Sequence, residues 1–267
     1  MEQKSSHNNI SLDKAFQIIE YLSSCSIPQS VAEVSQTLNF NRATTNNLLG
    51  TMLNHKYVTK DKYGKYSLSS KLFEIGCTYH QNSPLVQALV QQNFFETHNY
   101  NCALGLSVPA YPFKGILLCV QNNMNNFDNI PLVGNTLPLH ASGAGKLILA
   151  YATNEYRESF YKQCKLYSYT ENTITDRQTL NEELALTRAR GYAKDTCEVR
   201  SGLCCISAPI FNAERHLAAA VSITGPMDFI VPNESKLIQD VITLGQLITF
   251  RIGGIGEYSA APHPTTY

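Results

Sequence analysis

Residues 30–66, SVAEVSQTLNFNRATTNNLLGTMLNHKYVTKDKYGKY, decide the fold of the N-terminal part of the chain. Ser30 and Glu33 have the spacing of a capping box, in which each side chain bonds the other residue's backbone amide. Apolar residues then recur at helical spacing until residues 39–41 interrupt the pattern. Asn41 stands where it can cap a second helix. The segment therefore predicts two short helices joined by a tight turn.

The second predicted helix, residues 42–55, has one apolar face and one polar face. The polar face carries short amides, hydroxyls and methyl groups and no carboxylate, from Ala43, Thr44, Asn47, Thr51 and Asn54. In the major groove of DNA, asparagine can bond adenine through two hydrogen bonds, and a methyl group can pack on thymine. This helix is therefore a candidate recognition helix.

A charged hairpin is predicted directly after this helix. Residues 57–61 and 65–68 alternate like strands around Lys62-Tyr63-Gly64, where glycine permits a tight turn. Residues 36–71 contain six lysine or arginine residues and one acidic residue, although the whole chain has a formal net charge of zero. Such a local excess of positive charge suits contact with phosphates. Together these features predict a winged helix-turn-helix. Its candidate DNA contacts are Arg42, Ala43, Thr44, Asn46, Asn47, Lys62 and Lys65.

One alternative stays open at this point. Short helical pairs with a hairpin also occur in modules that bind only protein. The chain would then be a small-molecule-sensing protein or an enzyme with a protein-binding N-terminal module.

Composition restricts the class of protein and its location. The chain has 267 residues, of which 43% are hydrophobic and 16% are charged, which suits two globular domains. No run of 18 apolar residues occurs, and the polar N-terminus lacks the apolar core of a signal peptide. We therefore expect a cytoplasmic protein without a membrane partner. The eight cysteines show no C-x-x-C spacing, so we predict no metal site, although a zinc site built from distant residues stays open.

The rest of the chain is expected to form linker helices and an α+β domain. We expect a disordered lead-in over residues 1–10, and a DNA-binding domain over 11–69 whose first helix Ser11 caps. Linker helices follow over 70–99, an effector-binding domain over 100–254 and a disordered tail over 255–267. The apolar stripe from Leu85 to Phe95 packs either on a partner subunit or within its own chain. Strands, then helices, then strands again predict one antiparallel sheet with helices.

Several stretches resemble the IclR family of bacterial transcriptional regulators. They are AFQIIEYL (15–22) with DKYGKYSL (61–68), GNTLPLHASGAGK (134–146), and RGYAKDTCE (190–198) with GLCCISAPIF (202–211). Residues 170–175 and 222–226 add to the resemblance, which covers about residues 11–252. It implies a winged helix-turn-helix, a linker helix and a GAF-like effector-binding domain. It also implies a homodimer or homotetramer on a double-stranded DNA operator, most often a repressor, with no catalytic role.

Two departures from the family pattern concern the two sites. Family members commonly carry an arginine in the recognition helix where this chain has Asn47. They often have two acidic residues after the position of Asp195, whereas Thr196-Cys197-Glu198 keeps one. We therefore expect an unusual operator and an unusual effector.

The glycine-rich stretch Ser142–Gly145 is the candidate anion site of the C-terminal domain. It fails as a Walker loop because His140 stands where glycine is required, and as a dinucleotide fingerprint because of Ile148. We therefore expect no cofactor and no enzyme activity. Free amides and the positive end of a helix can hold an anion there, although the glycines could instead serve helix-on-sheet packing. The expected effector is a small hydroxylated or keto carboxylate, such as a sugar acid. The predicted effector-binding residues, the last four on the strength of the resemblance, are Gly143, Ala144, Asp195, Cys205, Ser222 and Thr224.

Overall fold

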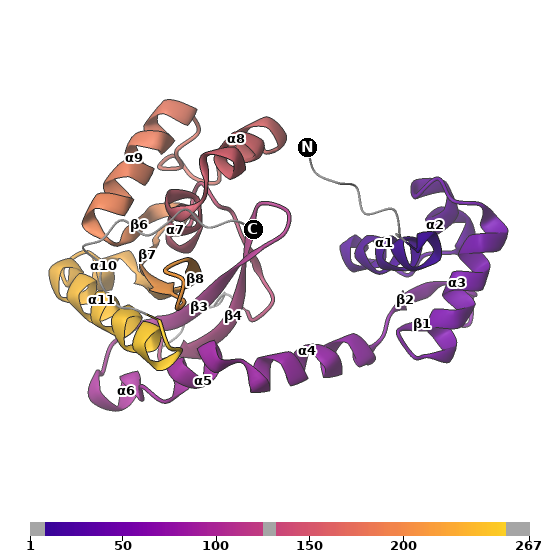
Figure 1. Cartoon of the computed structure of the whole chain (residues 1–267), viewed down its shortest axis with the longest axis horizontal. Coiled ribbons are helices and arrows are strands. Elements are labelled where there is room, and N and C mark those ends of the chain that lie inside the picture. Colours follow the sequence, from indigo (N-terminus) through magenta and orange to yellow (C-terminus); the bar gives the residue numbers. More distant parts are fainter. Residues whose placement is uncertain (1–8, 125–131, 255–267) are drawn as a thin grey trace. The chain divides into compact units, whose positions relative to one another are not determined.

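The computed structural model describes residues 9–124 and 132–254, which form two compact units, residues 1–81 and 82–267 (Figure 1). Most of the predicted lead-in and the whole predicted tail, residues 255–267, lie outside the described residues.

The N-terminal unit contains the predicted winged helix-turn-helix. Its helices are α1 (Ile10–Ser24), α2 (Val31–Thr37), α3 (Arg42–Asn54) and α4 (Ser70–Asn82), and its wing strands are β1 (Val58–Lys60) and β2 (Tyr66–Leu68). Both halves of the capping box at the start of α2 are present, and the Asn41 side chain caps α3. These two predictions are confirmed.

The predicted cap of α1 is wrong by two residues. Asn9 is the N-cap, and its Oδ1 accepts hydrogen bonds from the amides of Ser11 and Leu12. Because its own amide is bonded in this way, Ser11 already lies within the first helical turn.

The wing is held by its turn and by a bridge to the segment before α2. Gly64 has φ +80°, and the Asp61 carboxylate accepts from the amides of Tyr63 and Lys65. Gln29 and Tyr66 exchange two backbone hydrogen bonds of 2.8 and 2.7 Å, so β2 is paired on both sides. The core beneath combines α1, α2 and α3 with both strands, through Ile18, Leu22, Val34, Leu49, Met52, Val58 and Tyr66.

The C-terminal unit is built on one six-stranded antiparallel sheet, in the order β5-β4-β3-β8-β7-β6. The strands are β3 (Ala103–Ala110), β4 (Lys114–Asn122), β5 (Thr136–Leu137), β6 (Ala193–Arg200), β7 (Leu203–Phe211) and β8 (Leu217–Pro226). The helices are α5 (Pro84–Val90), α6 (Phe94–Thr97), α7 (Gly143–Tyr151), α8 (Asn154–Gln163), α9 (Arg177–Arg190), α10 (Met227–Ile230) and α11 (Glu234–Arg251). The predicted α+β class is therefore observed.

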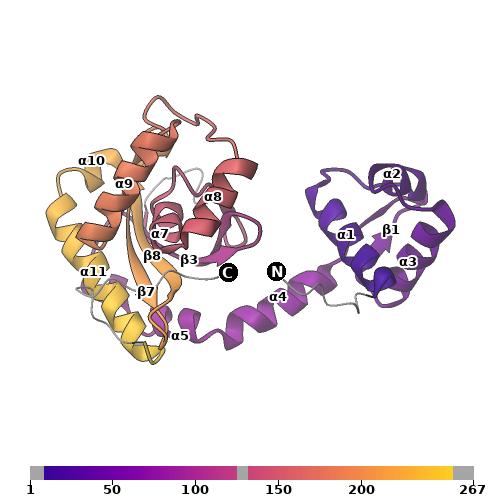
Figure 2. The same ribbon diagram turned by 45° about the horizontal axis from the view of Figure 1, so that its top comes forward.

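Helices cover both faces of this sheet (Figures 1 and 2). One apolar core joins α5 and α11 to the sheet, and a second core joins α7, α8 and α9 to it. Strand β7, which lies between β8 and β6, shows the consequence, since all but one of its residues are buried. Its sequence is accordingly a nearly continuous run of small and apolar residues rather than an alternating one.

The segment over residues 83–99 forms two short helices, α5 and α6. They are separated at Asn93, which adopts a left-handed conformation with φ +49°. The apolar stripe of this segment packs within its own chain, where Val86, Ala88, Leu89 and Phe94 belong to the core of the C-terminal unit. In contrast, none of the residues of α4 is buried.

This packing makes a prediction that two neighbouring residues can test. Leu89 is 0% exposed and Val90 is 47% exposed. We expect Leu89→Ala to lower the free energy of unfolding by about 2–5 kcal/mol, because it leaves a cavity in the core. Val90→Ala should cost well under half as much. Urea unfolding followed by far-ultraviolet circular dichroism measures both, and equal losses would contradict the packing of α5.

Candidate functional site

Helix α3 exposes the face predicted to read DNA. Arg42, Ala43, Asn46 and Asn47 are exposed and Thr44 is half-buried. The opposite face anchors the helix, because Thr45, Leu49 and Met52 are buried. The predicted residues of this helix therefore share one accessible surface.

The two predicted wing lysines have different surroundings. Lys62 is exposed, and its Nζ lies 5.0 Å from the centre of the Tyr63 ring. Lys65 is half-buried, and its Nζ lies 3.7 Å from Oε1 of Glu33, the capping-box acid of α2. An ion pair this exposed contributes at most about 1 kcal/mol to stability. Lys65 therefore stays available to a phosphate at small cost.

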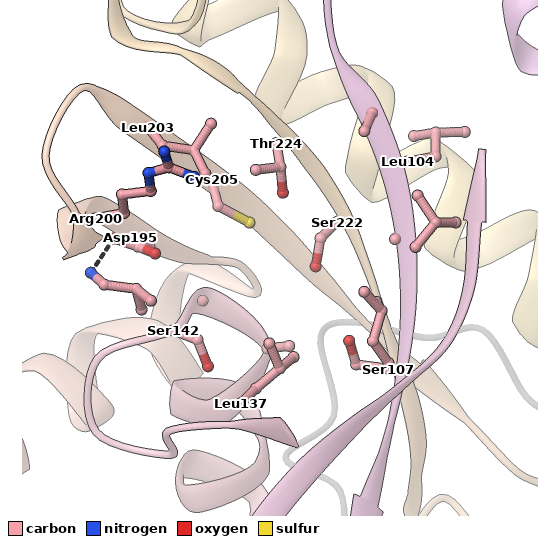
Figure 3. A pocket seen from close by; sticks show the side chains of 17 residues that line it. Leu104, Ser107, Leu137, Ser142, Asp195, Arg200, Leu203, Cys205, Ser222 and Thr224 are labelled. Carbon is pink, nitrogen blue, oxygen red and sulfur yellow. Dashed lines mark hydrogen bonds between the residues drawn. The ribbon is translucent and has the colours of Figure 1, made fainter. Parts of the chain in front are cut away.

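A cavity of about 90 Å³ in the C-terminal unit brings all six predicted effector-binding residues together (Figure 3). It lies between the N-terminus of α7 and strands of the sheet. Its other lining residues are Ala103, Leu104, Gly105, Ser107, Leu117, Val120, Leu137, Ser142, Val199, Arg200 and Leu203.

At one end of the cavity, two glycines allow α7 to approach its neighbours closely, because they have no side chain. A Cβ on Gly143 would lie 2.5 Å from Ser207 Oγ, and one on Gly145 would lie 2.5 Å from the Leu139 Cα. The packing interpretation of these glycines is therefore sufficient to explain them. Ser142 caps the helix by accepting from the Gly145 amide at 3.0 Å. The cavity reaches Gly143 and Ala144 at this first turn.

Small hydroxyl groups and a thiol form a second wall. Neighbouring strands place Ser207 opposite Ser222 and Cys205 opposite Thr224. The hydroxyls of Ser207 and Ser222 are 2.7 Å apart, and the Cys205 thiol lies 3.4 Å from Ser207 Oγ. Burial, with the nearby Asp195 charge, raises the pKa of the Cys205 thiol. This cysteine therefore lines the wall as a neutral thiol rather than as an activated nucleophile.

Asp195 is the buried acid of the cavity, with only 7% of its surface exposed. Burial and then the Glu198 charge raise its pKa to about 7, against two amide hydrogen bonds that lower it. Those bonds come to Oδ1 from Glu198 at 2.6 Å and from Val199 at 3.4 Å. The acid can therefore be either a charged acceptor or a neutral donor near neutral pH.

A buried ion pair fixes the segment that carries Asp195. Lys146 Nζ of α7 donates to Glu198 Oε1 at 2.5 Å and to the Lys194 carbonyl at 2.9 Å. Both charged side chains are almost completely buried. The pair ties α7 to the irregular part of β6, where Cys197 has φ +58°.

Sequence reasoning missed Arg200, which also lines the cavity. Alternation along a regular strand would put Arg200 on the opposite face from Asp195, five residues earlier. The register of β6 against β7 shifts between these two residues, and the bulge brings both to the same cavity. No pattern in the sequence marks that shift.

Family models of known proteins match both parts of the chain. The IclR helix-turn-helix domain matches residues 11–62, and the bacterial transcriptional regulator IclR C-terminal domain matches residues 122–249. The transcriptional repressor IclR of Escherichia coli is 28% identical over 249 residues, covering 92% of this chain and 90% of that protein. The chain belongs to the IclR family.

Other family members are also similar to this chain over most of its length. The repressor AllR of E. coli is 29% identical over 241 residues, covering 89% of this chain and 85% of its own length. A crystal structure of an IclR regulator from Silicibacter sp. TM1040 covers 96% of this chain and all of its own, with a TM-score of 0.79 and 20% identity. An IclR homolog from Microbacterium hydrocarbonoxydans has a TM-score of 0.72 and 19% identity, over 91% and 99% of the two chains.

This membership decides the class of protein. The family relatives are transcriptional regulators, so the chain is a transcriptional regulator and not an enzyme. Over residues 9–124 and 132–254, no helix is long and apolar enough to span a bilayer. Within the same ranges, no three His, Cys, Asp or Glu side chains gather in a possible metal site.

The raised pKa of Asp195 predicts a specific pH dependence of stability. The folded protein retains the proton up to about pH 7, whereas the unfolded chain loses it near pH 4, so this residue's contribution to stability falls as pH rises between these values. We expect the difference in free energy of unfolding, Asp195→Asn minus parent, to rise by roughly 1–3 kcal/mol from pH 5 to pH 8.

Asp176→Asn is the control. A hydrogen bond from the backbone amide of Thr179 lowers the pKa of Asp176 below its usual value. Asp176 is therefore ionised in both the folded and the unfolded protein from pH 5 to pH 8. Its difference from the parent should be flat between pH 5 and pH 8. Urea titrations at four pH values measure both variants, and a flat curve for Asp195→Asn would contradict the burial of an ionisable acid in the cavity.

Proposed function

We propose that this IclR-family protein is a repressor that releases its operator when a small organic acid occupies the cavity beside α7. The observation that carries the proposal is the convergence of the α7 amides, Asp195, Ser222 and Thr224 on one small cavity. The repressor role is supported by the relatives IclR and AllR, both repressors by name. We also propose a cytoplasmic location, which the proposed DNA operator as partner supports.

The chemistry of the two walls favours an acid that carries hydroxyl or keto groups. The amides of Gly143 and Ala144 begin a helix, and the positive end of a helix favours a carboxylate over a neutral group. Ser222, Thr224 and Asp195 can bond hydroxyl or keto oxygens. A purely apolar ligand would leave these groups unpaired, at about 1–3 kcal/mol each. A homolog has been solved with 4-hydroxybenzoate, an acid with one hydroxyl, and another relative is an acetate operon repressor.

Release of DNA requires that the acid favour one conformation of the protein. A ligand with equal affinity for both conformations shifts nothing, however tightly it binds. The cavity walls come from α7 and from strands of the sheet, so a bound acid stabilises one spacing of α7 against the sheet. We propose that this spacing belongs to the form with low operator affinity.

The DNA-binding surface predicts two kinds of mutational effect. Lys62→Ala and Lys65→Ala should weaken binding to all sequences alike and lower the salt slope by about one unit per lost phosphate contact. Asn47→Ala should instead change the preference at one base pair by ~1–3 kcal/mol. Gel shifts with DNA flanking the protein's own gene measure both, with the exposed Lys162→Ala of α8 as control. A uniform loss for Asn47→Ala would remove its proposed base-reading role.

The cavity hydroxyls predict a loss of effector affinity without a loss of operator affinity. Thr224→Val keeps the shape of the side chain and removes one hydroxyl. The probe is a 2-hydroxy acid that raises the thermal stability of the parent protein. We expect Thr224→Val to weaken its binding about tenfold, which is near the ~1–3 kcal/mol cost of an unpaired polar group. The control is Thr196→Val, at the exposed position of β6 directly after Asp195, which should leave binding unchanged. Calorimetric titration measures affinity and a gel shift measures operator binding. Equal affinity of Thr224→Val and parent would exclude this wall from the site.

We also propose that the protein acts as a dimer whose interface includes α4. This helix buries none of its residues and exposes Phe73, Ile75 and Tyr79 at 76%, 44% and 61%. An exposed apolar helix face of this kind is typical of an interface. A dimer would place two recognition helices one turn of DNA apart, or a multiple, on a palindromic operator.

A pair of exposed phenylalanines tests the dimer. Phe73→Glu should shift sedimentation from dimer to monomer at micromolar concentration and weaken operator binding at least tenfold, because the charge would be buried at the interface. Phe250→Glu, at a residue 79% exposed on α11, is the control and should change neither property. A parent protein that sediments as a monomer and binds its operator fully would refute the dimer.

A further inference from the structure

Arg200 is the one cation among the described residues that line the cavity, and Asp195 is the one anion. The remaining lining side chains are apolar or carry a hydroxyl or thiol group. A single arginine in such a wall has a large effect on which ligand charge the cavity accepts. A guanidinium is always ionised and can bond a carboxylate through two parallel hydrogen bonds.

The backbone holds Arg200 at a fixed place on the cavity rim. It is the last residue of β6 and lies directly opposite Leu203, the first residue of β7. Gly202, with φ +76°, allows the short turn that joins the two strands. The Arg200 residue is exposed, so a ligand can reach it from solvent.

The cavity therefore has two positive regions on either side of Asp195. In the view of Figure 3, Asp195 lies between Arg200 and Ser142, the cap of α7. The amides of the first turn of α7 carry partial positive charge, and the guanidinium carries a full charge. A ligand with one carboxylate can use only one of these regions at a time.

We propose that the effector is a short dicarboxylate, with one carboxylate at the first turn of α7 and the second bound by Arg200. The proposal rests on the proposed function, because it specifies the acid that the same cavity binds. Arg200 is then a specificity-determining residue that separates dicarboxylates from monocarboxylates.

The size of the cavity limits the length of this acid. Its volume of about 90 Å³ is far below the roughly 300–1,000 Å³ of pockets that hold drug-sized ligands. A chain of about three to five carbons is therefore the class to test.

Asp195 is compatible with a dianion although an ionised Asp195 would repel it. Because burial raises the pKa of Asp195 to about 7, the acid takes up a proton at little cost near neutral pH. A protonated Asp195 donates a hydrogen bond to a ligand oxygen instead of repelling it. Binding should accordingly strengthen as pH falls from 8 to 6.

Matched acids and matched variants test the proposal in the full-length protein. The probes are malonate, succinate, glutarate and malate, each paired with the monocarboxylate of the same carbon chain: propionate, butyrate, valerate and 2-hydroxybutyrate. Calorimetric titration should show at least one dicarboxylate binding the parent tenfold or more tightly than its partner acid. Arg200→Gln should weaken that dicarboxylate at least tenfold and change the monocarboxylate less than twofold. Arg200→Lys, which keeps the charge without the planar fork, should be intermediate.

The control is Arg215→Gln, in the turn between β7 and β8 and outside the cavity, which should bind like the parent. Equal losses for both acids in Arg200→Gln would overturn the proposal, as would parent affinities that do not distinguish the two classes. Monocarboxylates that bind and release the operator would overturn the dicarboxylate alone and leave the proposed function intact. If no acid of either class binds or releases the operator, the proposed function fails as well.

Discussion

The ion pair between Lys146 and Glu198 is the constraint on which the cavity depends. Each charge is costly to bury alone, and the short contact between them, with the Lys194 carbonyl as a further acceptor, offsets that cost. The pair therefore fixes where α7 meets the bulge of β6. Breaking it by removing one partner would leave an uncompensated charge inside the domain, and both walls of the cavity would lose their mutual position.

The same junction determines the electrostatics of the cavity. The bulge turns the Glu198 and Val199 amides toward Asp195, and the burial that follows raises its pKa. The bulge also returns Arg200 to the cavity side of β6. One local irregularity thus supplies an acid that titrates near neutral pH and a permanent cation a few residues away.

Close packing makes the cavity small. Helix α7 lies near enough to β7 for Gly143 to require the absence of a side chain, and Ser207 and Ser222 bond each other across the strands. The cavity lies where small residues from β3, β7 and β8 meet α7.

The N-terminal unit relies on local interactions. The capping box of α2 and the Asn41 cap of α3 set the angle of the turn, and the core residues between them fix the recognition helix. Pairing of Gln29 with Tyr66 anchors the wing to the segment before α2. The exposed face of α3 is therefore presented by a rigid scaffold, and the residues on it are free to determine sequence preference.

Local signals determined much of the N-terminal unit from the sequence alone. The caps at Ser30 and Asn41, the helical periods and the turn at Gly64 act over a few residues, so a sequence pattern contains them completely. The exposed face of α3 follows from the same period. The cap of α1 was misplaced because Asn9 and Ser11 are both good capping residues, and only the hydrogen bonds distinguish them.

The tertiary structure alone decided the features that depend on contacts between distant segments. The apolar stripe after residue 84 could serve a partner or its own chain, and its burial against α11 and the sheet settled which. Glycines 143 and 145 could serve a ligand or packing, and their distances to Ser207 and Leu139 showed close packing. Arg200 lines the cavity because a bulge in β6 shifts the alternation of side chains along that strand. Each outcome depends on long-range packing or register, which residue spacing along one segment does not specify.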